Sequence, residues 1–311
     1  MNLVPFATLV DGKGHALVES YWLAYFSSGR ELVGAGSDLP KPASDLLLVA
    51  NPAFDNKATT SGSQTVALRS RDFRGVFSPL QGTERESQEI PLLVAGRQEL
   101  KQVLVGERAQ ESAVKTARSP RILHLATHGF FLQDEELALG DETRGLSLLE
   151  RDLTVQPKKS GTTKKYENPL VRSGLAFAEA NHASEITDGD YGILTALEIT
   201  GMDLYGTDLV VLSACDTGVG EVKAGEVVFS LRRAFALAGA KNLLMSLWPV
   251  SAEITANQVK AFYQNFQKLP PAEALRQAQL ETIKELKAKD GVASPALWAP
   301  FILQGGQALV Q

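Results

Sequence analysis

The stretch that decides the fold lies near the middle of the chain and reads Arg121-Ile122-Leu123-His124-Leu125-Ala126-Thr127-His128-Gly129. A second stretch has the same design and reads Asp208-Leu209-Val210-Val211-Leu212-Ser213-Ala214-Cys215-Asp216-Thr217-Gly218. Each begins with an apolar run that predicts a buried parallel strand. In open α/β sheets, ligands bind at the carboxyl ends of the strands. We therefore expect His128 and Cys215 to lie at the same edge of one sheet.

The rest of the chain extends this pattern, because strand patterns alternate with helical patterns from residue 46 onward. The alternation predicts an α/β fold with a mostly parallel central sheet and helices on both faces. We expect a single domain over residues 1–311, with an N-terminal strand region at 1–45 and a catalytic core at 46–311. Residues 133–168 are charged and lack periodicity, which predicts an insertion loop that is open to cleavage.

Composition narrows the class of protein. The chain has 311 residues, of which 44% are hydrophobic and 22% charged, as in a globular protein with a core. The net charge of −5 argues against direct binding to nucleic acid. A single cysteine excludes an internal disulfide and is typical of a reducing compartment. We find neither a signal peptide nor an apolar run long enough to cross a membrane, so we expect a cytoplasmic protein.

The two reactive side chains fit covalent catalysis. A cysteine thiolate can attack a carbonyl if an imidazole takes its proton and later protonates the leaving amine. The backbone N–H groups of Gly129 and Cys215 are candidate donors to the oxyanion. The alternative is a buried cysteine that acts as a small hydrophobic residue, beside a surface histidine. We favour catalysis because both residues end strands and both are followed by glycine.

The other motifs give weaker evidence of function. His124 is interpreted as a core histidine, because four strand residues span about 13 Å, too far to share one metal ion with His128. The glycine pair before Glu226 lacks the lysine of a phosphate-binding loop, so nucleotide binding is not expected. Asp216 either orients His128 or occupies a turn, and Trp248 either lines a pocket or packs in the core. No metal or organic cofactor is expected.

Several segments together resemble the CHAT family of caspase-like cysteine peptidases, which are often joined to tetratricopeptide repeats. The segments that carry the resemblance are residues 124–129, 168–175, 192–198, 212–218, 231–235 and 245–250. The resemblance implies a caspase-like α/β sandwich with a dyad of His128 and Cys215. It also implies that the strand near Met245–Trp248, with Ser246 and Trp248, presents an edge to an extended peptide substrate.

The chain departs from the family pattern in three ways. Repeats and a further strand usually precede the segment that starts at Pro5, which leaves open that the domain is N-terminally truncated. Residues 128 and 215 are farther apart than the spacing of about 50 residues in caspases, and the insertion at 133–168 fits the excess. Ser213 stands where relatives that cleave after basic residues often carry an acid, so no basic specificity is inferred.

These observations predict a cysteine endopeptidase that acts on a protein or peptide substrate. We expect a regulatory partner or an upstream repeat domain to switch it on, and the chain alone to be inactive or weakly active. The alternative is a non-catalytic module that binds peptides on the same fold. The two differ in whether the thiol of Cys215 is activated.

Overall fold

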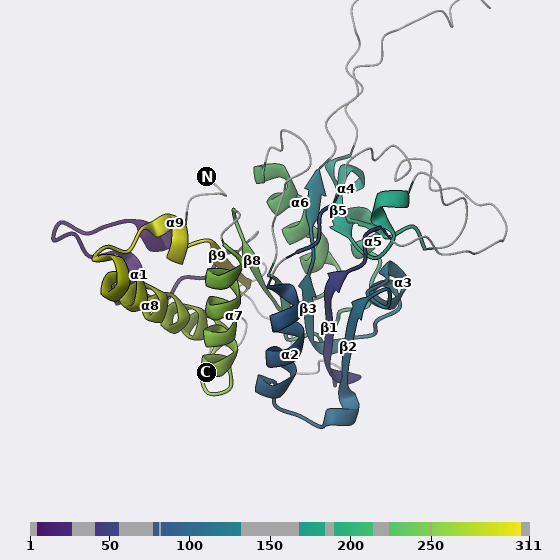
Figure 1. Ribbon diagram of the computed structural model, residues 1–311, viewed down its shortest axis with the longest axis horizontal. Coiled ribbons are helices and arrows are strands. Elements are labelled where there is room, and N and C mark those ends of the chain that lie inside the picture. The colour runs from purple at the N-terminus through teal and green to yellow at the C-terminus, as the bar shows by residue number, and fades with distance from the viewer. Residues whose placement is uncertain are drawn as a thin grey trace, which may run out of the picture.

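A computed structural model of the protein describes residues 5–26, 41–55, 77–80, 82–131, 168–183, 190–213, 224–248 and 251–305. The centre of the fold is a six-stranded sheet (Figure 1). In spatial order its strands are β2 (Lys101–Gly106), β1 (Ser44–Pro52), β3 (Pro120–Ala126), β7 (Leu209–Leu212), β8 (Asn242–Ser246) and β9 (Phe301–Gly305). All neighbouring pairs are parallel except β8 and β9.

The sheet is built from the continuous apolar runs of the sequence. Every residue of β7 is buried, and β3 is buried from Ile122 to Ala126. Strands that are covered on both faces are typical of parallel sheets with helices above and below. The mostly parallel α/β fold predicted from the sequence is therefore confirmed.

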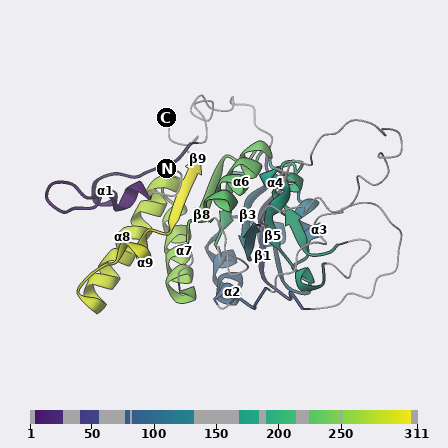
Figure 2. The same ribbon diagram turned by 90° about the horizontal axis from the view of Figure 1, so that it is seen from above.

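Helices cover both faces of this sheet (Figure 2). One face packs against α2 (Thr83–Leu93), α7 (Ala252–Phe266) and α8 (Pro271–Asp290), which contribute apolar side chains such as Ile90 and Phe262. The other packs against α3 (Glu111–Lys115), α5 (Ala196–Ile199) and α6 (Ala224–Leu237), with side chains such as Val114 and Phe235. The shorter helices are η1 (Phe6–Thr8), α1 (Leu17–Ser20), η4 (Gln98–Leu100), α4 (Pro169–Arg172), η6 (Ala180–His182) and α9 (Pro295–Trp298).

A second, three-stranded antiparallel sheet follows the carboxyl end of β3. It contains β4 (Gly129–Phe131), β5 (Ser173–Ala176) and β6 (Ile193–Thr195), in that order. Only Thr127 and His128 separate β3 from β4. The chain thus leaves one sheet and enters the other at His128, which places this residue at the junction of the two.

The N-terminal region corrects one expectation. Within the described residues, Phe6–Thr8 forms a turn of 3-10 helix and Leu17–Ser20 one helical turn, where strands were expected. Extended pairing is limited to isolated bridges, such as that of Tyr25 with Gln304 of β9. The apolar side chains of this segment pack against α8 and α9. Its described backbone forms no continuous ladder with another strand.

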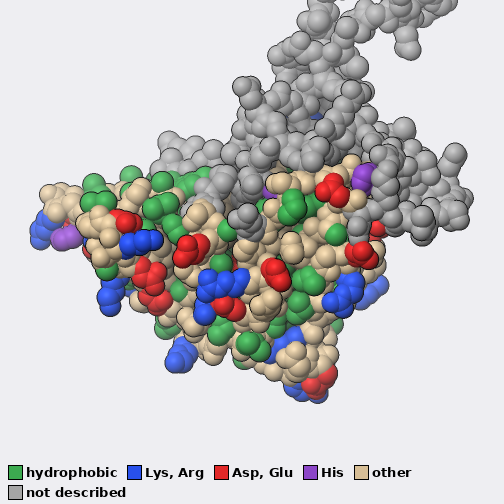
Figure 3. All heavy atoms as spheres, viewed as in Figure 1, with side chains coloured by type: hydrophobic (Ala, Val, Ile, Leu, Met, Phe, Trp, Pro, Cys, Tyr) green, Lys and Arg blue, Asp and Glu red, His purple; other side chains and the backbone are tan. Residues whose placement is uncertain are grey.

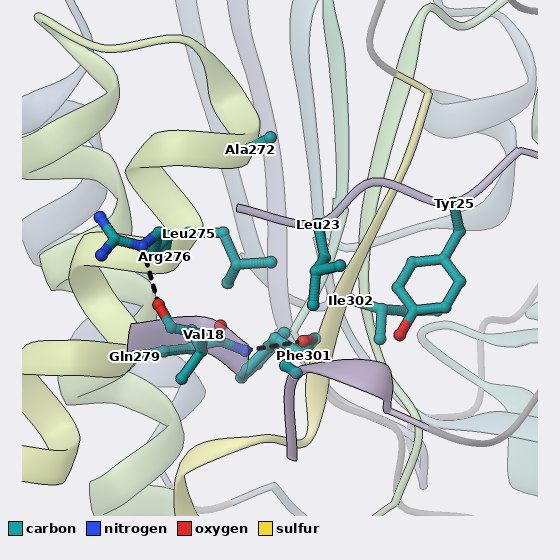
Figure 4. Close-up of a pocket in the computed structure, with 10 residues that line it drawn as sticks. Val18, Leu23, Tyr25, Ala272, Leu275, Arg276, Gln279, Phe301 and Ile302 are labelled. Atoms are coloured by element: carbon teal, nitrogen blue, oxygen red, sulfur yellow. Dashed lines mark hydrogen bonds between the residues drawn. The ribbon is translucent and has the colours of Figure 1, made fainter. Parts of the chain in front are cut away.

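The N-terminal segment, residues 5–26, is fixed to the C-terminal part of the chain. Its side chains meet those of α8 and β9 around a small, largely apolar pocket (Figure 4). The Arg276 guanidinium donates to the carbonyl oxygens of Val18 and Glu19, both at 2.7 Å. The Tyr25 amide donates to the Leu303 carbonyl oxygen at 2.8 Å, so this segment covers part of the outer edge of β9.

The structure narrows the expectation of a substrate-binding edge at β8. This strand pairs with β7 over Leu243–Met245 and with β9 over Asn242–Ser246. The Leu247 amide then donates to the Pro300 carbonyl oxygen at 2.8 Å. An extended peptide cannot add along Leu243–Met245, because backbone partners occupy both sides there. On the side of β7 the described pairing ends at Met245, so an edge at Ser246–Trp248 stays a prediction.

The structure describes only some of the regions that were predicted from the sequence. Residues 132–167, nearly all of the expected insertion loop at 133–168, lie outside the described residues, so that expectation stays a prediction. Within the described ranges, no helix is long and apolar enough to cross a membrane.

Candidate active site

His128 is the predicted site residue that the structure places most clearly. It lies two residues beyond the end of β3 and is 3% exposed. The Ala176 amide donates to the His128 carbonyl oxygen at 2.9 Å, and the Thr127 hydroxyl donates to the Ala176 carbonyl oxygen. These bonds to the end of β5 fix the backbone at the point where the chain passes from β3 to β4.

The imidazole of His128 is held in one tautomer. Its Nε2 lies 2.7 Å from the carbonyl oxygen of Ser78. A carbonyl oxygen can only accept a hydrogen bond, so Nε2 must carry the proton. In the neutral ring, Nδ1 is therefore the nitrogen with the lone pair. A proton added at Nδ1 would give an imidazolium whose Nε2–H still donates to Ser78.

Two aromatic rings pack against this imidazole. The ring of Phe77 stacks on it with centroids 5.5 Å apart, and the ring of Phe54 is tilted against it at 5.2 Å. The centroids of the two phenylalanine rings are themselves 5.7 Å apart, so the three rings form a triangle. Both phenylalanines are almost fully buried and belong to a small cluster with Phe130 of β4. These contacts restrict rotation of the His128 side chain.

Gly129 is oriented by the pairing of β4 with β5. Gly129 lies opposite Leu175, and the neighbouring pair, His128 and Ala176, is joined by a backbone hydrogen bond. Because hydrogen-bonded and non-bonded pairs alternate in an antiparallel ladder, the N–H of Gly129 points away from β5. In the described part of the chain β4 is an edge strand, so this N–H faces the open side, as an oxyanion donor requires.

The nucleophile predicted from the sequence is placed only by its strand. Cys215 and Asp216 both lie outside the described residues. Their strand, β7, is the immediate neighbour of β3, and the Ser213 amide still donates to the Leu125 carbonyl oxygen at 3.2 Å. The segment that leads to Cys215 therefore leaves the sheet beside the segment that leads to His128.

The other two predicted substrate residues lie at the end of β8, one strand beyond β7. The Ser246 side chain is buried and its hydroxyl donates to the Trp248 carbonyl oxygen at 2.7 Å. The indole N–H of Trp248 donates to the Ala296 carbonyl oxygen at 2.8 Å. Both residues lie at the edge that carries His128, and their role in substrate binding stays a prediction.

His124 is confirmed as a core histidine. It is fully buried, with Nε2 2.9 Å from a carboxylate oxygen of Glu86 and Nδ1 3.0 Å from the hydroxyl oxygen of Tyr263. Burial raises the pKa of Tyr263 well above 10.0, and the nearby carboxylate of Glu86 acts in the same direction. The tyrosine therefore stays protonated and donates to Nδ1, while Nε2–H donates to Glu86. Both nitrogens are thus occupied inside the core.

No metal centre emerges from the part of the chain that the structure describes, where no three His, Cys, Asp or Glu side chains are grouped to hold an ion. The surface carries charges of both signs. On the face viewed in Figure 3, acidic and basic side chains are interspersed and do not form a patch of one sign.

Sequence reasoning missed the residues that surround His128. Phe54 comes from a loop before residues 56–76, and Phe77 and Ser78 come from the loop after them. Asn181 comes from η6. Phe54 and Phe77 are aromatic residues next to polar segments, and that position was the only available signal. Nothing local distinguishes Ser78 or Asn181, because their importance depends on contacts across the fold.

The chain is similar to a known domain family and to curated proteins. The family model of the CHAT domain, a family related to caspase-like cysteine peptidases, matches residues 1–306. Tetratricopeptide repeat protein 28 of Mus musculus is 28% identical over 237 residues, which cover 75% of this chain and 9% of the relative. The Homo sapiens protein of the same name is 27% identical over 315 residues, with 98% of this chain and 11% of the relative covered. The chain thus spans about a tenth of the length of these curated relatives.

Proposed function

Because the chain belongs to the CHAT domain family, we propose that it is a cysteine endopeptidase with Cys215 as nucleophile and His128 as general base and acid. The observation that carries the proposal is the imidazole of His128, buried and held by the Ser78 carbonyl oxygen in the Nε2–H tautomer. This tautomer leaves Nδ1 as the base.

The strand register supports the pairing of the two residues. Leu125 lies opposite Leu212 in the parallel ladder of β3 and β7. His128 follows Leu125 by three residues, and Cys215 follows Leu212 by three residues. Neighbouring parallel strands that end together deliver equally spaced residues to one edge of the sheet. This register supports the proposal that Cys215 lies within reach of Nδ1 of His128.

The proposed reaction proceeds in two steps. Nδ1 of His128 takes the proton of the Cys215 thiol, and Sγ attacks the carbonyl carbon of the scissile peptide bond. The oxyanion is stabilised by the N–H groups of Gly129 and Cys215. His128 then protonates the amide nitrogen, the C–N bond breaks, and a thioester remains on Sγ. Water, deprotonated by His128, hydrolyses the thioester and regenerates the thiol.

A partner or a preceding repeat segment is proposed to control this activity. The curated relatives are named for tetratricopeptide repeats, and the chain covers only about a tenth of them. Holding the active state at about 1% of molecules requires a free-energy difference of only about 2.7 kcal/mol. An added segment could supply that difference through contacts made only in the active state. We expect the isolated chain to turn over peptides more slowly than a longer protein that carries such a segment.

The dyad is tested by the pH dependence of alkylation with iodoacetamide, followed by mass spectrometry. Cys215 is the only cysteine, so the modification has one possible site. We expect a midpoint below the free-thiol value of about 8.5, which rises toward that value in His128→Gln. The control is His15→Gln, an exposed histidine of the N-terminal segment. A midpoint near 8.5 that His128→Gln leaves unchanged contradicts the dyad and favours a non-catalytic binding module.

Peptidase activity itself is tested on a peptide library derived from a proteome, with new N-termini labelled and sequenced. We expect the wild-type sequence to cleave peptides, weakly as this chain and faster as part of a longer native protein. The same proteins with Cys215→Ala should cleave none. Cleavage that persists in Cys215→Ala overturns the assignment of the nucleophile.

A further inference from the structure

Asn181 of η6 joins the two loops that surround His128. Its side-chain oxygen accepts from the Phe77 amide at 2.7 Å, and its side-chain nitrogen donates to the Phe77 carbonyl oxygen at 3.0 Å. The same nitrogen donates to a carboxylate oxygen of Asp55 at 2.6 Å. Its backbone amide donates to the Phe54 carbonyl oxygen at 3.0 Å. One residue thus holds Phe77 at both backbone groups and also binds the loop that contains Phe54.

These contacts lead directly to the imidazole. Phe54 and Phe77 supply the two rings that pack against His128. Ser78, which follows Phe77 in the chain, supplies the carbonyl oxygen that fixes the tautomer of His128. Residues 77–80 and 53–55 are loops without helix or strand pairing of their own. The position of the Ser78 carbonyl oxygen therefore depends on the contacts that hold Phe77.

We propose that Asn181 is a positioning residue, which keeps His128 in its Nε2–H tautomer by holding Phe77 and Ser78 against the ring. It acts through its neighbours, since its hydrogen bonds in the described part of the chain are with Phe54, Asp55 and Phe77. The inference rests on the proposed function insofar as it concerns catalysis. The statement about the tautomer of His128 stands on the geometry alone.

Asparagine suits this position for a chemical reason. A carboxamide offers an acceptor and two donor hydrogens in one plane, so it can pair with an N–H and a C=O group of the same residue and still reach Asp55. Aspartate lacks the donor, and leucine lacks both groups. The substitutions Asn181→Asp and Asn181→Leu therefore remove this set of bonds in two stages.

The decisive measurement is the tautomer of His128 by NMR of protein labelled with ¹⁵N-histidine. The chain has only four histidines, so the signals of His128 are identified by their loss in His128→Gln. In the wild type we expect a protonated Nε2 and an unprotonated Nδ1. In Asn181→Leu we expect a mixture of tautomers. A wild-type spectrum of His128 in Asn181→Leu overturns the proposal.

The consequence for chemistry is measured on the same variants. With a cleaved library peptide as substrate, we expect kcat of Asn181→Leu to fall about 10²-fold, the loss associated with misplacement of about 1 Å, while KM changes little. The alkylation midpoint of Cys215 should rise toward about 8.5. A KM effect with unchanged kcat and unchanged midpoint indicates a purely structural role and contradicts the proposal.

Two further variants keep the test decisive. If Asn181→Leu does not fold, Asn181→Asp removes only the donor. Its partner change, Asp55→Asn, restores a donor toward residue 181, so the double variant should recover part of the wild-type tautomer and midpoint. Absence of recovery contradicts the proposal.

The matched control is Asn265→Leu. Asn265 is half-buried as Asn181 is, and its side chain bonds Ala261 and Glu281, away from His128. We expect it to leave the histidine spectrum unchanged. Cleavage that persists in Cys215→Ala would refute the proposed function alone, because the NMR result on His128 does not depend on turnover.

Discussion

His124 and His128 lie four residues apart and are both buried, yet their surroundings differ in kind. The ring of His124 is bonded at both nitrogens by side chains, a carboxylate from α2 and a phenol from α7. The ring of His128 is held at Nε2 by a backbone carbonyl oxygen and packs against two aromatic rings. The first arrangement ties helices to the sheet, and the second orients a candidate base.

The difference follows from the end of the strand. His124 lies within β3, so its side chain projects from the sheet into the layer of α2 and α7. β3 ends at Ala126, and the chain turns into β4 directly after His128. The same residue type is therefore a core element inside the strand and a candidate base beyond it. Spacing along the sequence does not distinguish the two; the position of the strand end does.

The largest effect is expected from His128→Gln. Removal of the proton acceptor should lower the Cys215-dependent turnover of a cleaved peptide by about 10²–10⁴-fold, the usual contribution of general acid–base catalysis. The free energy of unfolding, measured in urea alongside, should fall much less than it does for a substitution at His124. Wild-type turnover in His128→Gln would contradict the proposal that His128, unlike His124, is a base.

The next effect is on stability and comes from His124→Leu. This substitution leaves the buried carboxylate of Glu86 without its imidazole partner, and we expect a loss of about 3–5 kcal/mol in the free energy of unfolding. The double variant with Glu86→Leu should recover most of that loss, because both polar groups are then replaced by apolar ones. The rate of Cys215 alkylation in the folded protein should stay at the wild-type value. A fall in that rate without unfolding would show that the two histidines are coupled.

The smallest effect is expected from Tyr263→Phe. The loss of the hydroxyl leaves Nδ1 of His124 without a donor, at a cost of about 1–3 kcal/mol. Because burial raises the pKa of Tyr263, the folded state keeps this proton while the unfolded state releases it above about pH 10. The wild type should therefore lose stability above about pH 10, and the Phe variant should lose less. Equal pH profiles from urea unfolding would contradict a bonded phenol at this position.

The central sheet was predictable because its strands are continuous apolar runs. The stretch from Ile122 to Ala126 and the stretch from Leu209 to Leu212 need no information beyond their own composition. The second sheet was not predicted, because its strands have only three or four residues and include Gly129 and Gly174, which look like turn residues. The partner of β8 was also missed, since a pairing between distant segments leaves no local pattern.

In the candidate site, too, only the residues that belong to a local sequence pattern were predictable. His128 and Gly129 follow an apolar run, so a strand-end argument located them. The tautomer of His128 was not predictable, because it depends on the backbone carbonyl oxygen of Ser78, and any residue type can supply one. Asn181 is still harder to find, since it contacts neither a strand end nor His128, and only the folded loops reveal it.

The attachment of Tyr25 to β9 has a consequence for the order of folding. Its backbone bonds are with Leu303 and Gly305, near the opposite end of the sequence. During synthesis the segment around Tyr25 is made well before β9 and has no docking site until β9 leaves the ribosome. Closing so long a loop is slow, since its entropy must be lost before the contacts form. The domain therefore cannot complete its fold, or assemble its proposed peptidase site on a finished sheet, until almost all of this chain has been translated.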